Sequence, residues 1–291
     1  MNTTHLHRRL LAVLGLACLT PFCVHAEVYI NETFEGDTAG VAPSDPAQKT
    51  ASQVLTAAGT GLIGTDNVAH YNDTSTTGGG GMEYNVGSSA LGALQISFDL
   101  FNNNATASGT AANPLIFGVA NWNNSSSTLM GANANRSFGI EFYQVGASST
   151  VRVRNGTSTT VLTGSYDMAA VIKVSIFIND HDTNTLDYTM PGTSTTATLN
   201  ANSAVIFLNG SLIGTETTAG FVLSSSVGSG NATGDATLGR LGFNSSSTNT
   251  PNFLIDNLYV SDISAVPEPS ACAAFAGAGV LGLAFWRRRR A

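Results

Sequence analysis

The segment Leu94-Gln95-Ile96-Ser97-Phe98-Asp99-Leu100 alternates apolar and polar residues without a break. Successive side chains of a β-strand point to opposite faces of the sheet, so this pattern predicts a strand with one buried face. Ile172-Lys173-Val174-Ser175-Ile176-Phe177-Ile178 alternates in the same way over seven positions. A helix repeats every 3.6 residues and would scatter these apolar positions around its axis. The two segments therefore predict an all-β fold.

Shorter runs of the same kind continue along the chain. Val205 to Ile213 encloses Asn209-Gly210, a pair that favours the two-residue turn of a β-hairpin. No stretch between residues 27 and 265 has a long helical period. Many short strands separated by Gly- and Asn-rich turns predict one antiparallel β-sandwich over residues 27–265, a jelly roll or a related sandwich. Further predicted strands are Phe138–Phe142, Val151–Arg154, Leu241–Phe243 and Phe253–Val260.

The order of these segments between Leu94 and Val260 resembles that of concanavalin A-like lectin/glucanase sandwiches and laminin-G-like domains. The resemblance is one of architecture and implies a lectin-like sandwich. The segments that carry it are Phe138–Phe142, Ile172–Ile178, Asn179–Thr183, Leu186–Tyr188 and Phe207–Gly210.

The first 26 residues have the order of a secretory signal peptide. Arg8 and Arg9 precede an apolar run from Leu10 to Val24, and Val24-His25-Ala26 supplies small residues for cleavage. We therefore predict a signal peptide over residues 1–26, cut by signal peptidase between Ala26 and Glu27. Pro21 and the cleavage site argue against the alternative, a permanent N-terminal anchor.

Residues 27–265 contain no cysteine, since Cys18, Cys23 and Cys272 lie outside this range. Disulfides therefore cannot stabilise the exported part, although its compartment would permit them. The same range has 18 acidic and six basic residues, for a net charge near −12. Such a charge argues against nucleic acid as a partner and is compatible with neutral sugars and divalent cations.

The C-terminal segment, residues 266–291, has three parts in sequence. Val266-Pro267-Glu268-Pro269 is an extended stub, because proline fixes φ and disfavours helix before it. Sixteen uncharged residues follow, Ala271 to Trp286, long enough for roughly 24 Å of helix against a hydrocarbon core of about 30 Å. They predict a short transmembrane helix in the inner membrane. A buried core helix is the alternative, but Arg287, Arg288, Arg289 and Arg290 end the run and favour the cytoplasmic side.

This order resembles the PEP-CTERM sorting signal of Gram-negative bacteria. The resemblance implies that Val266, Pro267, Glu268 and Pro269 are recognised by an exosortase, a membrane-embedded cysteine peptidase, and that the tail is removed. It further implies a transient membrane anchor and a final place at the cell surface or in an extracellular polysaccharide matrix.

Two segments resemble the opening and closing strands of jelly-roll carbohydrate-binding modules. Thr33-Phe34-Glu35-Gly36-Asp37 opens the domain, and Phe253 to Val260, which contains Asp256, closes it. In those modules carboxylates from both ends hold a structural calcium. The resemblance therefore implies Ca²⁺ ligands at Glu35, Asp37 and Asp256, which as oxygen donors suit this ion. The alternative is that they are ordinary turn and strand-end carboxylates.

The remaining candidates concern ligand binding and catalysis. Trp122, flanked by Asn121 and Asn123, is a candidate platform for a sugar ring, with core packing as the alternative. We find no nucleophile motif, no zinc motif and no paired-Glu strand motif. The sequence thus predicts a non-catalytic surface or matrix protein that binds polysaccharide. The alternatives are a glycan-cleaving enzyme, either a glycoside hydrolase or a polysaccharide lyase, and a structural coat protein.

Replacing Pro267 and Pro269 by Ala should block removal of the tail, because the stub would lose its extended shape. We expect the mature protein to keep the mass of residues 266–291, as measured by intact-protein mass spectrometry. A mature mass equal to that of the unmodified protein would contradict the processing hypothesis.

Overall fold

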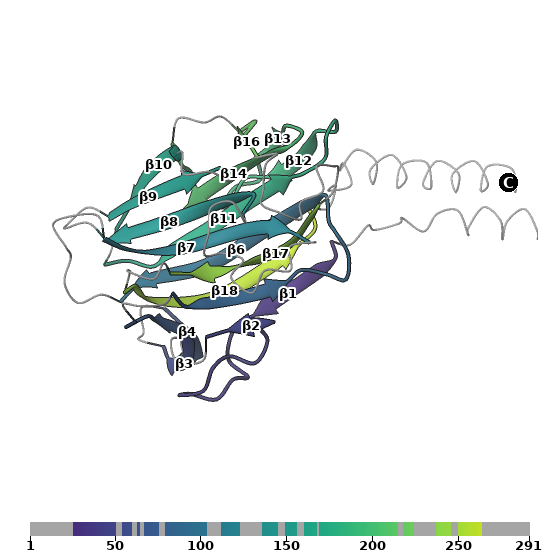
Figure 1. Ribbon diagram of the computed structural model, residues 1–291. Helices are drawn as coiled ribbons and strands as arrows, with labels where there is room; N and C mark the ends of the chain where they lie inside the picture. The colour runs from purple at the N-terminus through teal and green to yellow at the C-terminus, as the bar shows by residue number, and fades with distance from the viewer. Residues whose placement is uncertain are drawn as a thin grey trace, which may run out of the picture. The chain divides into compact units, whose positions relative to one another are not determined.

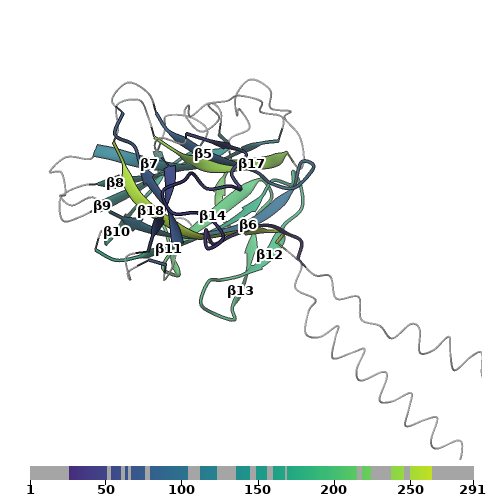
Figure 2. The ribbon, with the colours of Figure 1, turned by 90° about the horizontal axis from the view of Figure 1, so that it is seen from below.

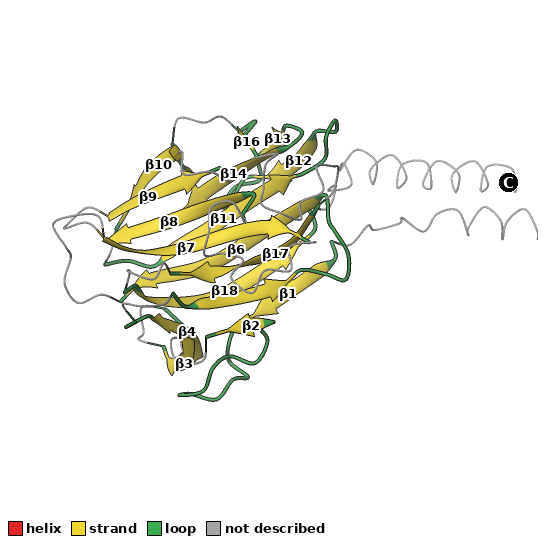
Figure 3. Cartoon of the chain, in the orientation of Figure 1, coloured by secondary structure: helices red, strands yellow, loops and turns green. Residues whose placement is uncertain are grey.

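The computed structural model describes residues 26–50, 54–59, 63–64, 67–75, 79–103, 112–122, 136–144, 149–155, 160–167, 169–214, 218–223, 237–245 and 250–263. Residues 26–263 form one compact unit. The predicted signal peptide up to His25 and the sorting segment lie outside the described residues. Figure 3 shows strands and loops and no helix in the described part of the chain.

The described strands form two large antiparallel sheets and one hairpin (Figure 1). This confirms the predicted all-β antiparallel fold. The nine-stranded sheet has the order β15 (Ser211–Leu212), β14 (Ser203–Leu208), β11 (Ile172–Asn179), β6 (Ala93–Asn102), β18 (Asn252–Ser261), β4 (Asn67–Asn72) and β3 (Val54–Ala58). Two further strands join this sheet: β1 (Val28–Glu32) pairs with β18, and β16 (Phe221–Val222) pairs with β14.

The second sheet is seven-stranded and packs against the first (Figure 2). Its order is β10 (Thr160–Tyr166), β9 (Ser149–Arg154), β8 (Phe138–Gln144), β7 (Ala112–Asn121), β17 (Leu238–Asn244), β5 (Gly81–Asn85) and β2 (Gln48–Lys49).

Alternation in the sequence decides which side chains enter the core between the sheets. In β6, Ile96, Phe98 and Leu100 are buried, while the intervening residues are partly exposed. The centre of the core is aromatic: the Phe98 ring lies 4.9 Å from that of Phe117 and 5.1 Å from that of Phe243. These residues come from β6, β7 and β17, so the cluster ties the two sheets together.

A hairpin covers part of the outer face of the nine-stranded sheet. Strands β12 (Leu186–Thr189) and β13 (Thr196–Leu199) pair with each other and project from that sheet on the side away from the seven-stranded sheet (Figure 2). Tyr188 and Leu199 pack there on Phe177, Val205 and Phe207. This second cluster explains why β14 is buried on both faces and lacks a strict polar alternation.

The hairpin predicted around Asn209-Gly210 is confirmed. Phe207 pairs with Leu212 and Leu208 with Ser211, leaving the two-residue turn between them. Asn209 has φ 50° and Gly210 has φ 78°, as both central residues of a type I′ turn require.

The first and last strands lie side by side. In β1 and β18, Ile30 pairs with Val260 and Glu32 with Leu258. Strand β4 pairs with the other half of β18, from Asn252 to Ile255. Between the two halves, Asn257 has φ 52° and interrupts the register with β6. This bulge therefore lies directly after Asp256 on β18.

Replacing Phe98 by Ala should lower the free energy of unfolding by about 3–5 kcal/mol, because the cavity lies among aromatic rings of both sheets. Denaturant unfolding measures the change. Val222→Ala is the control: that side chain is 68% exposed, so we expect a change within about 0.5 kcal/mol. Equal effects of the two substitutions would contradict this description of the core.

Candidate functional site

A groove of about 630 Å³, lined by both apolar and polar residues, lies on the outer face of the nine-stranded sheet, where the hairpin β12–β13 does not cover it. Its base is formed by β6 and β11, and its sides by the loop between β12 and β13 and the turn between β14 and β15. The lining residues are Ser97, Phe98, Asp99, Lys173, Val174, Ser175, Pro191, Gly192, Asn209, Gly210 and Asn257.

Strand register brings the charged residues of the groove together. Asp99 on β6 lies directly opposite Lys173 on β11 and, on its other side, opposite Asp256 on β18. The bulge residue Asn257 connects the two carboxylates: its Nδ2 donates to Asp99 Oδ2 at 3.0 Å and to Asp256 Oδ2 at 3.2 Å. One amide thus holds two like charges at neighbouring positions.

Asp256 is the buried member of this row, with 3% of its surface exposed. Burial raises its pKa to about 6, with smaller contributions in the same direction from Asp99 and Glu35, and the Asn257 backbone N–H opposes the shift. Asp99 is less buried and faces the groove. The groove therefore presents the Asp99 carboxylate, while Asp256 lies beside it on β18 and does not line the groove.

The walls of the groove are positioned by turn chemistry. Asn209 Oδ1 accepts a hydrogen bond from the Lys173 backbone N–H at 2.8 Å, which ties the β14–β15 turn to β11. A Cβ on Gly210 would lie 3.5 Å from the Pro191 carbonyl oxygen, so turn and loop are near neighbours. The site combines a carboxylate, an ammonium group, amides and hydroxyls, which together donate to and accept from sugar hydroxyls.

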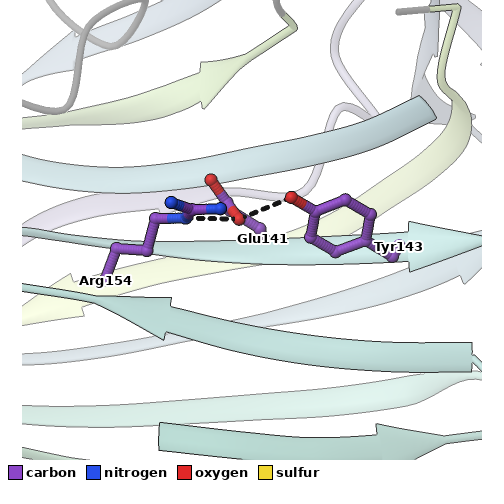
Figure 4. Close-up of polar contacts among 3 residues, drawn as sticks. All are labelled: Glu141, Tyr143 and Arg154. Atoms are coloured by element: carbon purple, nitrogen blue, oxygen red, sulfur yellow. Dashed lines mark hydrogen bonds and ion pairs between the residues drawn. The ribbon is translucent and has the colours of Figure 1, made fainter. Parts of the chain in front are cut away.

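A second polar cluster lies on the seven-stranded sheet (Figure 4). Glu141 Oε2 accepts hydrogen bonds from Tyr143 Oη and Arg154 Nε, each at 2.8 Å. The Arg152 guanidinium carbon lies 4.5 Å from the centre of the Tyr143 ring. Burial raises the pKa of Tyr143, and so does Glu141. Tyr143 therefore keeps its proton and acts as a donor, which suits a structural network better than a general base.

Glycines run in register beside this cluster. Gly242 pairs with Gly118, Gly118 with Gly139, and Gly139 with Arg154. A Cβ on Gly139 would lie 2.9 Å from Arg136 Nη1, so the Arg136 guanidinium rests on the strand backbone. Burial lowers the pKa of Arg136 to about 10, and Glu141 opposes the shift. These glycines admit the buried arginine, which a larger residue at position 139 would displace.

The predicted calcium ligands fall into two neighbourhoods. Glu35 contributes to the raised pKa of Asp256, so these two lie near each other. Glu35 Oε2 accepts the Asn67 backbone N–H at 3.2 Å. Asp37 Oδ1 accepts the Ser44 backbone N–H at 3.1 Å, and Asp37 lies near Glu32. Both Asp256 oxygens already accept hydrogen bonds from Asn257, so calcium at Glu35 and Asp256 stays a prediction.

Trp122, the predicted sugar platform, follows β7 and is partly buried. A Cβ on Gly239 would overlap its ring, so the indole packs against the start of β17. Trp122 does not line the groove. Its role as a sugar contact stays a prediction. The sorting residues Val266–Pro269 and Arg287–Arg290 lie outside the described part of the chain.

The sequence pattern does not identify the groove residues as a site, although they belong to the two strands with the most regular polar–apolar alternation. Ser97, Asp99, Lys173 and Ser175 are the outward positions of segments whose inward positions predicted the sheet. In the sequence, their polarity indicates only the exposed face of each strand. The pairing of β6 with β11 places them on one surface, which no local pattern indicates.

Among the residues that the structure describes, no helix has the length and apolarity needed to cross a membrane.

Comparison with known proteins confirms the predicted sorting signal. Residues 265–290 match the family model of the PEP-CTERM protein-sorting motif. The motif implies export and membrane-associated sorting in Gram-negative bacteria. No curated protein sequence matches the chain.

Several solved structures resemble the sandwich at low sequence identity. A carbohydrate esterase from the Shiga toxin-encoding bacteriophage phi24B is 15% identical, with 82% of this chain and 100% of that chain covered and a TM-score of 0.47. Lectin II from Ulex europaeus is 11% identical, with 75% and 96% covered and a TM-score of 0.38. Alginate lyase vAL-1 from a Chlorella virus is 8% identical, with 81% and 100% covered and a TM-score of 0.43.

Replacing Glu141 by Gln should lower the free energy of unfolding by about 2–3 kcal/mol, because it removes the negative partner of a partly buried arginine. Tyr143→Phe removes one hydrogen bond and should cost about 1 kcal/mol. Denaturant unfolding at neutral pH measures both. If Glu141→Gln were no more destabilising than Tyr143→Phe, the ion pair would not contribute as described.

Proposed function

We propose that this protein is an exported, non-catalytic polysaccharide-binding protein of the cell surface or extracellular matrix. It carries a PEP-CTERM motif, through which an exosortase would process it after signal peptidase has removed residues 1–26. The sandwich would then be released from its membrane anchor into a matrix of extracellular polysaccharide.

The groove over β6 and β11 is the observation that carries this proposal. Its size, about 630 Å³, accommodates a few sugar units, and its polar side chains come from four separate elements. Asp99 and Asn257 are held by their mutual hydrogen bond, so the acceptor and the amide are oriented before a ligand arrives. Preorganised polar groups lose little entropy on binding.

The charge of the exported part favours a neutral glycan over an anionic one. Lys173 is the single cationic residue in the described lining, and it lies opposite Asp99 in the strand register. Residues 27–265 have 18 acidic and six basic residues. A polyanionic chain would therefore be repelled by most of the surface.

The lining also supports binding over hydrolysis. Glycosidases that follow the usual mechanism need two carboxyl groups on either side of the scissile bond. Asp99 is the one carboxylate in the described lining, and its neighbour Asp256 is buried and does not line the groove. The tyrosine of the other polar cluster, Tyr143, has a raised pKa because it is buried, keeps its proton and donates a hydrogen bond to Glu141.

Replacing Asp99 by Asn or Lys173 by Met should weaken binding to a neutral polysaccharide about tenfold each, since a hydrogen bond to a charged group contributes about 1.5 kcal/mol. A neutral-glycan array followed by titration calorimetry measures the affinity. Asp187→Asn, an exposed carboxylate on the hairpin outside the groove, is the matched control and should bind as the unchanged protein does.

Three other outcomes would overturn the proposal. Binding that is equally weakened by Asp187→Asn would remove the groove as the site. Binding to no glycan would favour a structural coat protein. Shortening of a bound polysaccharide during incubation would favour an enzyme.

A further inference from the structure

Two carboxylates, Glu32 and Asp45, lie close together where the chain leaves β1, and a third, Asp37, lies nearby. Glu32 is the last residue of that strand, and Asp37 and Asp45 follow in the loop. Asp45 lies close enough to Glu32 to share a proton with it, and Asp37 also acts on Glu32 electrostatically. Lys49 is bound to the Ser44 carbonyl oxygen at 3.0 Å. In the described part of the chain, no cationic side chain forms an ion pair with any of the three.

Three side chains of this neighbourhood have a buried oxygen without a hydrogen-bond partner among the described residues. Glu32 is 7% exposed and Tyr84 is 3% exposed. Glu32 Oε2, Asp37 Oδ2 and the Tyr84 hydroxyl are buried, with no hydrogen-bond partner among the described residues. Burial raises the pKa of Tyr84, and the charges of all three carboxylates raise it further. The Tyr84 hydroxyl therefore belongs to this group. A buried polar atom without a partner costs about 1–3 kcal/mol, and several together require an occupant.

The backbone fixes one side of the cluster. Glu32 Oε1 accepts the Phe34 backbone N–H at 2.7 Å, and Phe34 is held at φ 59° with its ring buried. Asp37 Oδ1 is engaged by the Ser44 backbone N–H. Each of these two carboxylates thus uses one oxygen to hold the loop and leaves the other free.

We propose that Glu32, Asp37, Asp45 and the Tyr84 hydroxyl bind a calcium ion. All available donors are oxygens, which suits a hard divalent cation and excludes a preference for zinc or copper. Calcium accepts six to eight oxygens in irregular arrangements, whereas magnesium demands near-ideal octahedral geometry. The cation would place positive charge between carboxylates that otherwise repel each other.

The proposed ion would draw the third carboxylate inward. No three His, Cys, Asp or Glu side chains of the described residues already converge on one point to hold a metal ion. Glu32 and Asp45 are the close pair. A proton between these two carboxylates is the occupant that competes with calcium, and the experiment separates the two.

This site is separate from the one that the sequence implied at Glu35 and Asp256. Glu35 Oε2 is bound to Asn67, and Asp256 is bound to Asn257. Asp37 is a predicted ligand of that site, but in the structure it lies near Glu32 and acts on it electrostatically. Glu32 and Asp45 stand 52 and 39 positions before Tyr84 and share no motif with it, so no local pattern groups the three residues.

Calcium binding can be read from the thermal unfolding of the purified full chain in detergent. Adding Ca²⁺ in about 100-fold excess over its Kd to chelator-treated protein at pH 8 should raise the Tm by about 5–10 °C. Glu32→Gln and Asp45→Asn should each abolish most of this rise. Before calcium is added, the two variants should be no less stable than the unchanged protein, because each removes a repelling charge. Asp167→Asn, an exposed loop carboxylate, should keep the full rise.

Terbium luminescence gives a readout that does not depend on stability. Tb³⁺ replaces Ca²⁺ in oxygen sites and is sensitised by a nearby tyrosine, so emission excited through Tyr84 should be lost in Tyr84→Phe and in Glu32→Gln. A Glu35→Gln, Asp256→Asn double variant should keep this emission. The proposal is overturned if calcium leaves the Tm unchanged, if Glu32→Gln responds to calcium as the unchanged protein does, or if the emission is lost only in the double variant.

Discussion

The burial of two apolar sheet faces against each other is the constraint on which the described structure depends. The exported region has no cysteine, so no disulfide can compensate for a weak interior. Phe98, Phe117 and Phe243 meet at the centre, each from a different strand. Because this core fixes which side of every strand faces inward, it also fixes which residues reach the outer surfaces.

Polar residues are accommodated differently on the two large sheets. On the seven-stranded sheet, Glu141 and Arg154 neutralise each other and Arg136 lies on a glycine backbone, so charges are buried. On the nine-stranded sheet, the hairpin covers only the part around Phe177 and Phe207. The uncovered part keeps Asp99 and Lys173 available. That difference makes the nine-stranded sheet the better candidate for a ligand.

Closure of the chain upon itself organises the acidic residues. Strand β1 pairs with β18, which brings the opening and closing segments of the domain together as expected. The consequence differs from the expected one, because the loop after β1 directs Asp37 toward Glu32 and Asp45 and leaves Glu35 near Asp256. Two acidic neighbourhoods thus arise from one short stretch. A single Asn257 amide relieves repulsion in one of them.

By itself the sequence determined the identity of the strongest strands, the Asn209-Gly210 hairpin and the C-terminal sorting motif. Each depends on residues within a short window, through alternation, turn chemistry or motif order. Strands with weak alternation, such as β14 and β17, are explained only by burial on both faces. The groove and the Glu32 cluster were decided by the tertiary structure. Strand pairing places Lys173 opposite Asp99, and sheet packing places Tyr84 near Glu32. No local pattern specifies such long-range register.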